Sequence, residues 1–186
     1  MKKLLFTMTM VAAMTVSAEM KLGTVDMMLL VKNHPNYESN KTLLTSTDKD
    51  YQKKLEAIKS EGDKLQEEGK KLVEQMRNPM LTAKAKADVE RQLGDLQQKL
   101  IGIEQRYKGE ALRSRQELQD LEGRLLRATT DDLKKRIAKY ASAKGYDLIV
   151  DANAAPYATK TLDVTDDMLK ELGVEPKDAK GRDEGK

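Results

Sequence analysis

Few residues of this 186-residue chain are of the types that carry out covalent or metal chemistry. The chain has no cysteine and one histidine, His34, so it lacks the thiolates and histidine clusters of zinc sites, disulfide frameworks and cysteine enzymes. His34 precedes Pro35 and has no acidic or nucleophilic residue at a motif spacing. We therefore interpret it as a loop residue rather than a catalyst or ligand.

Two aspartates form the other candidate for chemistry. Asp147 and Asp151 are four residues apart in an apolar segment, so in a strand they would share one side and could divide acid and base roles. Solvation of strand ends and turn formation explain them better. The chain has no glycine-rich phosphate loop, and we interpret the glycosylation pattern Asn40-Lys-Thr42 as chance. We predict no catalytic residue, no cofactor, no metal and no enzyme activity.

The first 18 residues have the pattern of a secretory signal peptide. A basic start is followed by an uncharged apolar run from Leu4 to Val16, and small residues precede a cleavage position after Ala18. A membrane-spanning helix needs about 20 apolar residues, more than this run contains. We predict cleavage and a soluble exported protein from residue 19 onward, with a retained N-terminal anchor as the alternative. The absence of cysteine suits an oxidising compartment.

The basic residues are concentrated in the middle of the chain. Without Lys2 and Lys3 the formal charge falls to +1, whereas residues 41–140 hold 23 Lys and Arg against 18 Asp and Glu. The acidic residues are interspersed with the basic ones, and no aromatic ladder accompanies them, unlike a nucleic-acid-binding surface. We predict no nucleic-acid partner and at most peripheral contact with a membrane.

The same middle region has the four-three apolar spacing of an amphipathic helix with a narrow seam. The spacing stops at Asn78-Pro79, because proline lacks an amide hydrogen and disfavours a helical residue before it. We predict antiparallel helices at 42–77 and 82–142 with a tip near residues 77–82. The seam positions are Leu44, Tyr51, Leu55, Ile58, Leu65, Leu72 and Met76, then Val89 to Leu125, and, one residue out of step, Leu126, Leu133, Ile137 and Tyr140.

These helices are too long for a compact domain. At 1.5 Å per residue they would run about 50 Å and about 90 Å. We expect residues 41–140 to project as a coiled-coil arm, a helical hairpin whose seam covers only itself and whose remaining faces are solvated.

The flanking segments, residues 19–40 and 141–174, predict a small β-containing body. Branched apolar residues predict strands at 20–25 and 146–151, and a third short strand is expected at 155–160.

Helix boundaries can also be placed in the flanking segments. Asp26 is expected to cap a short helix that runs through Val31, and Gly145 to stop the long helix. We expect Thr165, Asp166 and Asp167 to cap a last helix that stops at Gly173. The charged, Gly- and Pro-containing residues 175–186 predict a disordered tail.

This body is too small to bury a core of its own. With no metal or disulfide, self-association is the simplest completion, and sheets from several copies that close into a barrel would remove the open strand edges. The predicted fold class is mostly α, with a long antiparallel helical hairpin projecting from a small β-barrel-like oligomerisation body. The candidates for the shared core are Leu22, Val25, Leu148, Ile149 and Val150.

Three short motifs around this hairpin resemble the periplasmic chaperones of the Skp/OmpH type. They are Lys21-Leu-Gly-Thr-Val-Asp26, Gly145-Tyr-Asp-Leu-Ile-Val-Asp-Ala-Asn153 and Asp163-Val-Thr-Asp-Asp167, and the resemblance covers nearly the whole mature chain. It implies a homotrimer with a small β-barrel body and three helical arms. The arms would enclose a cavity that holds unfolded outer-membrane proteins without ATP. The mature chain departs from the strongly basic charge common in that family.

Two features of the arms favour a holding role over the alternative, a structural coiled-coil spacer or adaptor of the cell envelope. Glycines inside a helix cost about 1 kcal/mol each relative to alanine, which suits flexible arms better than a stiff rod. The arm glycines are Gly62, Gly69, Gly94, Gly102, Gly109 and Gly123. Met76, Met80 and Leu81 lie at the tip, where flexible apolar side chains suit varied clients. Local packing of the tip is the alternative there.

Overall fold

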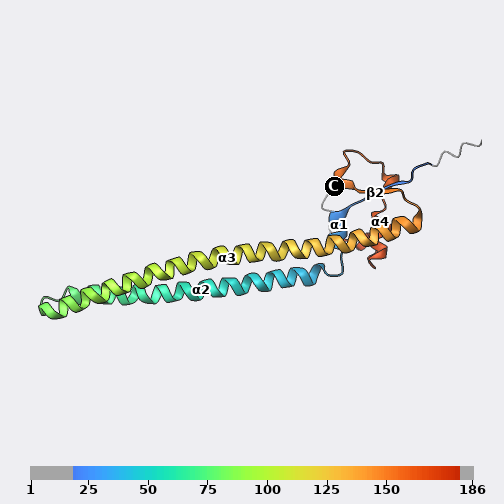
Figure 1. Cartoon of the computed structure of the whole chain (residues 1–186). Coiled ribbons are helices and arrows are strands. Elements are labelled where there is room, and N and C mark those ends of the chain that lie inside the picture. Colours follow the sequence, from blue (N-terminus) through green and yellow to red (C-terminus); the bar gives the residue numbers. More distant parts are fainter. Residues whose placement is uncertain (1–18, 181–186) are drawn as a thin grey trace, which may run out of the picture.

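The computed structural model describes residues 19–180 and contains a long helical hairpin joined at one end to a small body (Figure 1). The hairpin consists of α2 (Tyr37–Met76) and α3 (Ala83–Lys144). The body contains a two-stranded sheet and the short helices α1 (Met27–Lys32) and α4 (Thr165–Glu171). A mostly helical chain with two long helices and a small β element is thus confirmed. The predicted signal peptide lies outside the described residues.

The hairpin turns where the sequence predicts it. Helix α2 ends at Met76, and the Asn78 Oδ1 atom accepts a hydrogen bond from the Met80 amide at 3.0 Å. Thr82 then caps α3, because its hydroxyl accepts a hydrogen bond from the Ala85 amide at 3.3 Å. The Asn78-Pro79 break is confirmed.

Two glycines allow α2 and α3 to approach each other closely along the seam. A Cβ atom on Gly62 would lie 3.3 Å from Ile103 Cγ2, and one on Gly69 would lie 3.4 Å from Leu96 Cδ2. Polar contacts also cross the seam at Tyr51–Glu117, at 2.6 Å, and Arg106–Glu61. These pairs fix the register of the two helices.

The seam close to the body differs from the prediction. Leu126 is 53% exposed, whereas Thr129 is buried against α2 and its hydroxyl lies 3.4 Å from the Asn40 Nδ2 atom. An α-helix has 3.6 residues per turn and drifts relative to a seven-residue repeat. The predicted seam position at Leu126 is therefore wrong, because this side chain stays exposed instead of being buried between the helices.

The sheet pairs the strand before the hairpin with the strand after it, in parallel. Strand β1 (Leu22–Val25) lies beside β2 (Leu148–Asp151), with Leu22 opposite Leu148. Gly23 is required there, because a Cβ atom would lie 3.2 Å from Ile149 Cγ1. The predicted third strand at 155–160 is wrong. That segment contains Pro156, which has no amide hydrogen to donate, and the only further bridge to β1 in the described chain joins Thr24 to Asp163.

The ends of the short helices are held by side chains and glycines. Asp26 caps α1 by accepting from the Leu29 amide at 2.9 Å, as predicted. Gly145 ends α3 with a φ of 68° and Gly173 follows α4 with a φ of 78°, a region that favours glycine. The start of α4 differs from the prediction, because the side chain that accepts from the Thr165 amide is Asp163, at 2.8 Å.

The body buries a core within a single chain, which corrects the expectation that it is too small to do so. The last turns of α3 supply Leu133 and Tyr140 to this core, so part of the long helix belongs to the body. The other buried members are Val25, Leu29, Leu30, Val164, Met168, Leu169, Leu172 and Ala179.

The predicted disordered tail is wrong for residues 175–180. They include a short 3₁₀ helix, Pro176–Asp178, and Ala179 is buried in the body core. The remaining six residues of that prediction lie outside the described part of the chain.

A buried tyrosine links α3 to α4 and predicts a loss of stability at alkaline pH. The Tyr140 hydroxyl donates to Asp167 Oδ2 at 2.6 Å, and burial together with this bond raises the pKa of Tyr140 above its usual value. Stability from this group is full below about pH 10, the ordinary tyrosine pKa, and falls as the pH rises above it. Tyr140→Phe should therefore lose about 1.5 kcal/mol at pH 8 through the missing bond. It should also show a smaller decline than the wild type between pH 8 and 10.5.

Urea unfolding at fixed protein concentration measures both effects. Tyr157→Phe is the matched control, because Tyr157 is 83% exposed, and it should follow the wild type at each pH. Equal alkaline declines in the wild type and Tyr140→Phe would contradict the assignment.

Candidate functional site

An apolar groove of about 820 Å³ lies on the body. Helix α1, the body end of α3 and strand β2 form its walls. Three of its lining side chains are large, apolar and exposed, namely Met28, Leu126 and Leu148. We call this surface the body groove. Its apolar character suits a protein partner better than a small polar ligand.

The open edge of the sheet adds to this surface. Strand β2 hydrogen-bonds to β1 on one side, and no other described strand pairs with it. An unpaired strand edge offers amide and carbonyl groups to a further strand. A single chain therefore leaves apolar side chains uncovered in the groove and backbone hydrogen-bonding groups unpaired at the edge of β2.

The five predicted core residues differ in their surroundings. Val25 is buried in the core of its own chain, and Ile149 is half-buried against that core. Val150 is half-buried as well, while Leu22 and Leu148 are exposed. The last two are thus the members of the set that a single chain leaves most open to a partner.

The three predicted tip residues also differ in how far they are buried. Met76 and Leu81 pack against a small cluster of Leu72, Val89 and Leu96 between the helices. Met80 is 87% exposed. Tip packing thus accounts for Met76 and Leu81, and Met80 is the exposed one of the three.

Exposed apolar side chains are also spread along both arm helices, away from the tip. They occur at separate positions along the two helices, although Ile101 and Tyr107 line one pocket. The predicted four-three spacing places four of the five off the seam and only Tyr107 on it. On α2 they are Leu43 and Val73, and on α3 they are Ile101, Tyr107 and Leu112. These positions form a dispersed apolar surface along the arm.

The arm glycines have two kinds of surroundings. Gly62 and Gly69 lie at the seam. A Cβ atom on Gly94, Gly102 or Gly109 would have no neighbour within 4 Å, and one on Gly123 would meet only the Arg127 side chain. Close packing therefore explains the first two glycines and leaves the other four without a packing reason.

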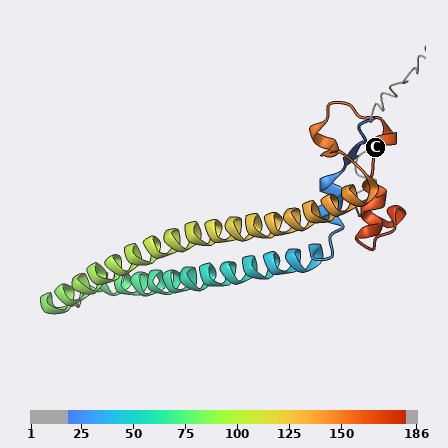
Figure 2. The same ribbon diagram turned by 45° about the vertical axis from the view of Figure 1, so that its right-hand side comes forward.

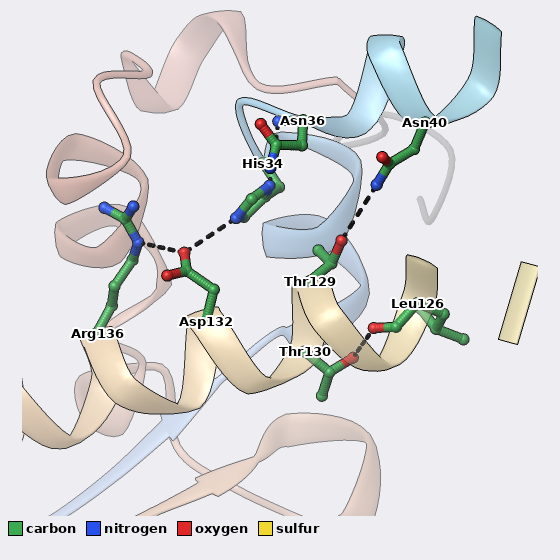
Figure 3. A network of polar contacts seen from close by, with 8 residues as sticks. All are labelled: His34, Asn36, Asn40, Leu126, Thr129, Thr130, Asp132 and Arg136. Atoms are coloured by element: carbon green, nitrogen blue, oxygen red, sulfur yellow. Dashed lines mark hydrogen bonds and ion pairs between the residues drawn. The ribbon is translucent and has the colours of Figure 1, made fainter. Parts of the chain in front are cut away.

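His34 lies in the loop between α1 and α2, as predicted, and it is buried there in a polar network (Figure 3). Its Nδ1 atom accepts from the Asn36 amide at 3.1 Å, so Nε2 carries the proton and donates to Asp132 Oδ2 at 3.0 Å. Arg136 donates to the same oxygen at 2.6 Å, and the Arg136 and His34 hydrogen bonds lower the pKa of Asp132. Both ring nitrogens are thus engaged. The network fastens the start of α2 to α3.

The two aspartates of the second motif do not form a pair. Asp147 accepts from the Lys21 amide at 2.7 Å, and Asp151 accepts from the Asn153 amide at 3.1 Å. Each binds a backbone amide at one end of β2, as the turn and strand-end interpretation expects. Within residues 19–180 no group of three or more potential ligands is placed to hold a metal ion. No described helix is long and apolar enough to cross a membrane.

Comparison with known proteins identifies the family. No curated protein matches the sequence closely enough to be called a relative. The profile of the family described as "Outer membrane protein (OmpH-like)" matches residues 21–172. That range begins in the residue before β1, spans both arm helices and ends after α4. A match over most of the chain, to the body and the hairpin together, places this protein in the OmpH-like family, whose members are periplasmic chaperones of outer-membrane proteins.

Proposed function

We propose that this protein is an ATP-independent holdase that binds unfolded outer-membrane β-barrel proteins between its arms and prevents their aggregation. The dispersed apolar surface of the arm carries this proposal. An unfolded client presents short apolar segments at irregular spacing, so many weak contacts suit it better than one pocket. Each contact covers part of a side chain and contributes at most about 1 to 2 kcal/mol, which allows clients to be released without nucleotide hydrolysis.

The charge of the arms supports the same role. Residues 41–140 carry five more basic than acidic residues, so acidic unfolded chains are attracted over a distance of about 10 Å at 0.1 M salt. Capture should slow at high salt, whereas apolar contact should persist.

We further propose that three copies assemble through their bodies into a barrel-like base, so that the arms surround a client cavity. The body groove and the open edge of β2 support this assembly, since a second copy can cover both. Export with cleavage after Ala18 would place the assembly in the periplasm.

A stiff envelope spacer is the alternative, and the glycines disfavour it. Gly94, Gly102 and Gly109 have open space where alanine would fit. Alanine there would strengthen the helix by about 1 kcal/mol per site. A rod gains nothing from these glycines, whereas arms that adjust to clients of different size do.

Shortened arms test the holding role. Residues 59–72 and 93–106 face each other across the seam, because Gly62 lies opposite Ile103 and Gly69 opposite Leu96. Deleting both segments removes two heptads, about 21 Å, from each helix while the tip and body remain. Roughly a quarter of the protection of an unfolded β-barrel protein against aggregation should be lost, since the deletion removes 28 of the 100 residues 41–140 and distributed contacts scale with covered area.

The measurement is light scattering after dilution of the client from urea, without nucleotide. Met80→Gln on full-length arms is the control, which isolates the tip and should lose little. Full protection by the shortened protein would show that the arms are not the client site. A second variant with Gly94, Gly102 and Gly109 changed to alanine should protect large clients less well than small ones, and equal protection of both would remove the flexibility argument.

A further inference from the structure

The chain beyond α4 turns back over the body toward the start of the arm (Figure 2). Gly173 ends the helix, and the Val174 amide donates to the Leu169 carbonyl at 2.9 Å, which closes the turn. Residues 175–180 then continue as the short 3₁₀ helix and the buried Ala179. This segment lies outside the range matched by the family profile, residues 21–172.

The end of this segment binds the connection between α1 and α2. The Lys180 amide donates to Asn33 Oδ1 at 2.8 Å, and Asn33 Nδ2 donates to the Lys180 carbonyl at 3.0 Å. This pair of bonds resembles one rung of a sheet, formed by a buried side-chain amide in place of a backbone. Asn33 Nδ2 also donates to the Leu29 carbonyl at the end of α1, at 2.8 Å.

A second contact reaches α2 itself. The Lys180 ammonium forms an ion pair with Glu38 in the first turn of α2, and this hydrogen bond lowers the pKa of Glu38. The segment therefore touches both sides of the connection formed by residues 33–36.

The opposite side of that connection is held by α3. His34 donates to Asp132, and Asn40 contacts Thr129 one turn along α2. The first turns of α2 thus have anchors on two sides, α3 on one and residues 175–180 on the other. Asn36, the N-cap residue just before α2, makes no side-chain capping bond, so these anchors supply what a cap would otherwise provide.

We propose that residues 175–180 are a strap that holds the start of the arm, the connection 33–36 and the first turns of α2, in place. They hold the first turns of α2 against α3, and their release lets this end of the helix open locally while the body and the outer arm stay folded. Local opening of this kind is governed by the few contacts at the site rather than by global stability. The strap thereby limits how far the arm can loosen where it leaves the body.

Two truncations test the strap. One ends after Val174, which retains the turn that closes α4, and its matched control ends after Lys180. Hydrogen exchange is followed at residues 37–43 of α2, with residues 89–96 of α3 as an internal reference. Loss of the strap should speed exchange at residues 37–43 by at least about tenfold relative to the control, because buried hydrogen bonds are lost. Exchange at residues 89–96 should not change.

A coupling measurement isolates the Asn33 contact. Asn33→Asp keeps the shape but removes the donor, and its effect on exchange should be larger in the chain ending after Lys180 than in the chain ending after Val174. Ala179→Glu in the full chain places a charge at a buried strap position and should reproduce the local acceleration without shortening the protein. Equal exchange at residues 37–43 in the two truncations, additive effects of Asn33→Asp, or an unchanged Ala179→Glu variant would overturn the proposal.

Discussion

Replacing Leu133 by alanine should destabilise the protein by about 2 to 5 kcal/mol, the range for deleting a fully buried leucine side chain. Leu133 is 0% exposed and belongs to the body core, although it lies on the long helix of the arm. Its side chain packs in the same cluster as Leu30 of α1 and Met168 of α4. The loss should therefore loosen the attachment of the arm as well as the core.

The measurement is urea unfolding at fixed protein concentration, followed by circular dichroism. Leu112→Ala is the matched control on the same helix, because Leu112 is 60% exposed. A surface substitution of this kind should change stability by less than about 0.5 kcal/mol. A loss below about 1 kcal/mol for Leu133→Ala would be too small for a full cavity and would contradict the role of α3 in the body core.

The hairpin could be predicted because its signals are local. A regular apolar repeat, one proline and a left-handed glycine stop fix two helices and a turn, and each signal acts within a few residues. The cap at Asp26 is also a local signal, because its hydrogen bond reaches a residue only three positions along the chain. Local rules failed at Leu126, because helical drift accumulates along a long helix and the buried face near the body is set by distant packing.

The missed contacts join residues that are far apart in the chain. His34 and Asp132 are separated by 98 positions, and Asn33 and Lys180 by 147. Composition predicts disorder from 175 onward, but one buried asparagine amide and one buried alanine hold residues 175–180 on the body. The third strand failed for a local reason, because Pro156 lies within it and has no amide hydrogen to donate to a sheet.

The candidate site shows the same division. The sequence predicted contact residues in the body strands and at the tip. Which of those side chains stay exposed could not be predicted, because it depends on how the single chain packs. Leu148 and Val25 lie in strands of similar composition, but only Leu148 is left open in the body groove. Leu148 is therefore the position at which a substitution can disrupt assembly without unfolding the single chain.

Leu148→Asp should dissociate the proposed assembly while the single chain stays folded. Leu148 is 51% exposed, so a carboxylate is tolerated by the monomer. In an interface the change forfeits about 2 kcal/mol of apolar burial and adds the cost of removing a charge from water. A combined loss near 2.7 kcal/mol or more raises the apparent dissociation constant at least about 100-fold. Ile149→Asp should in addition unfold the body, because Ile149 packs against the core of its own chain.

Sedimentation velocity over a dilution series, with circular dichroism on the same samples, separates the two effects. Leu112→Asp is the control, since it places the same charge on an exposed position of the arm, and it should assemble as the wild type does. A wild-type protein that remains a folded monomer at micromolar concentration would end the proposal of assembly through the bodies. If the wild type assembles and Leu148→Asp assembles equally well, the copies meet through a surface other than the body groove.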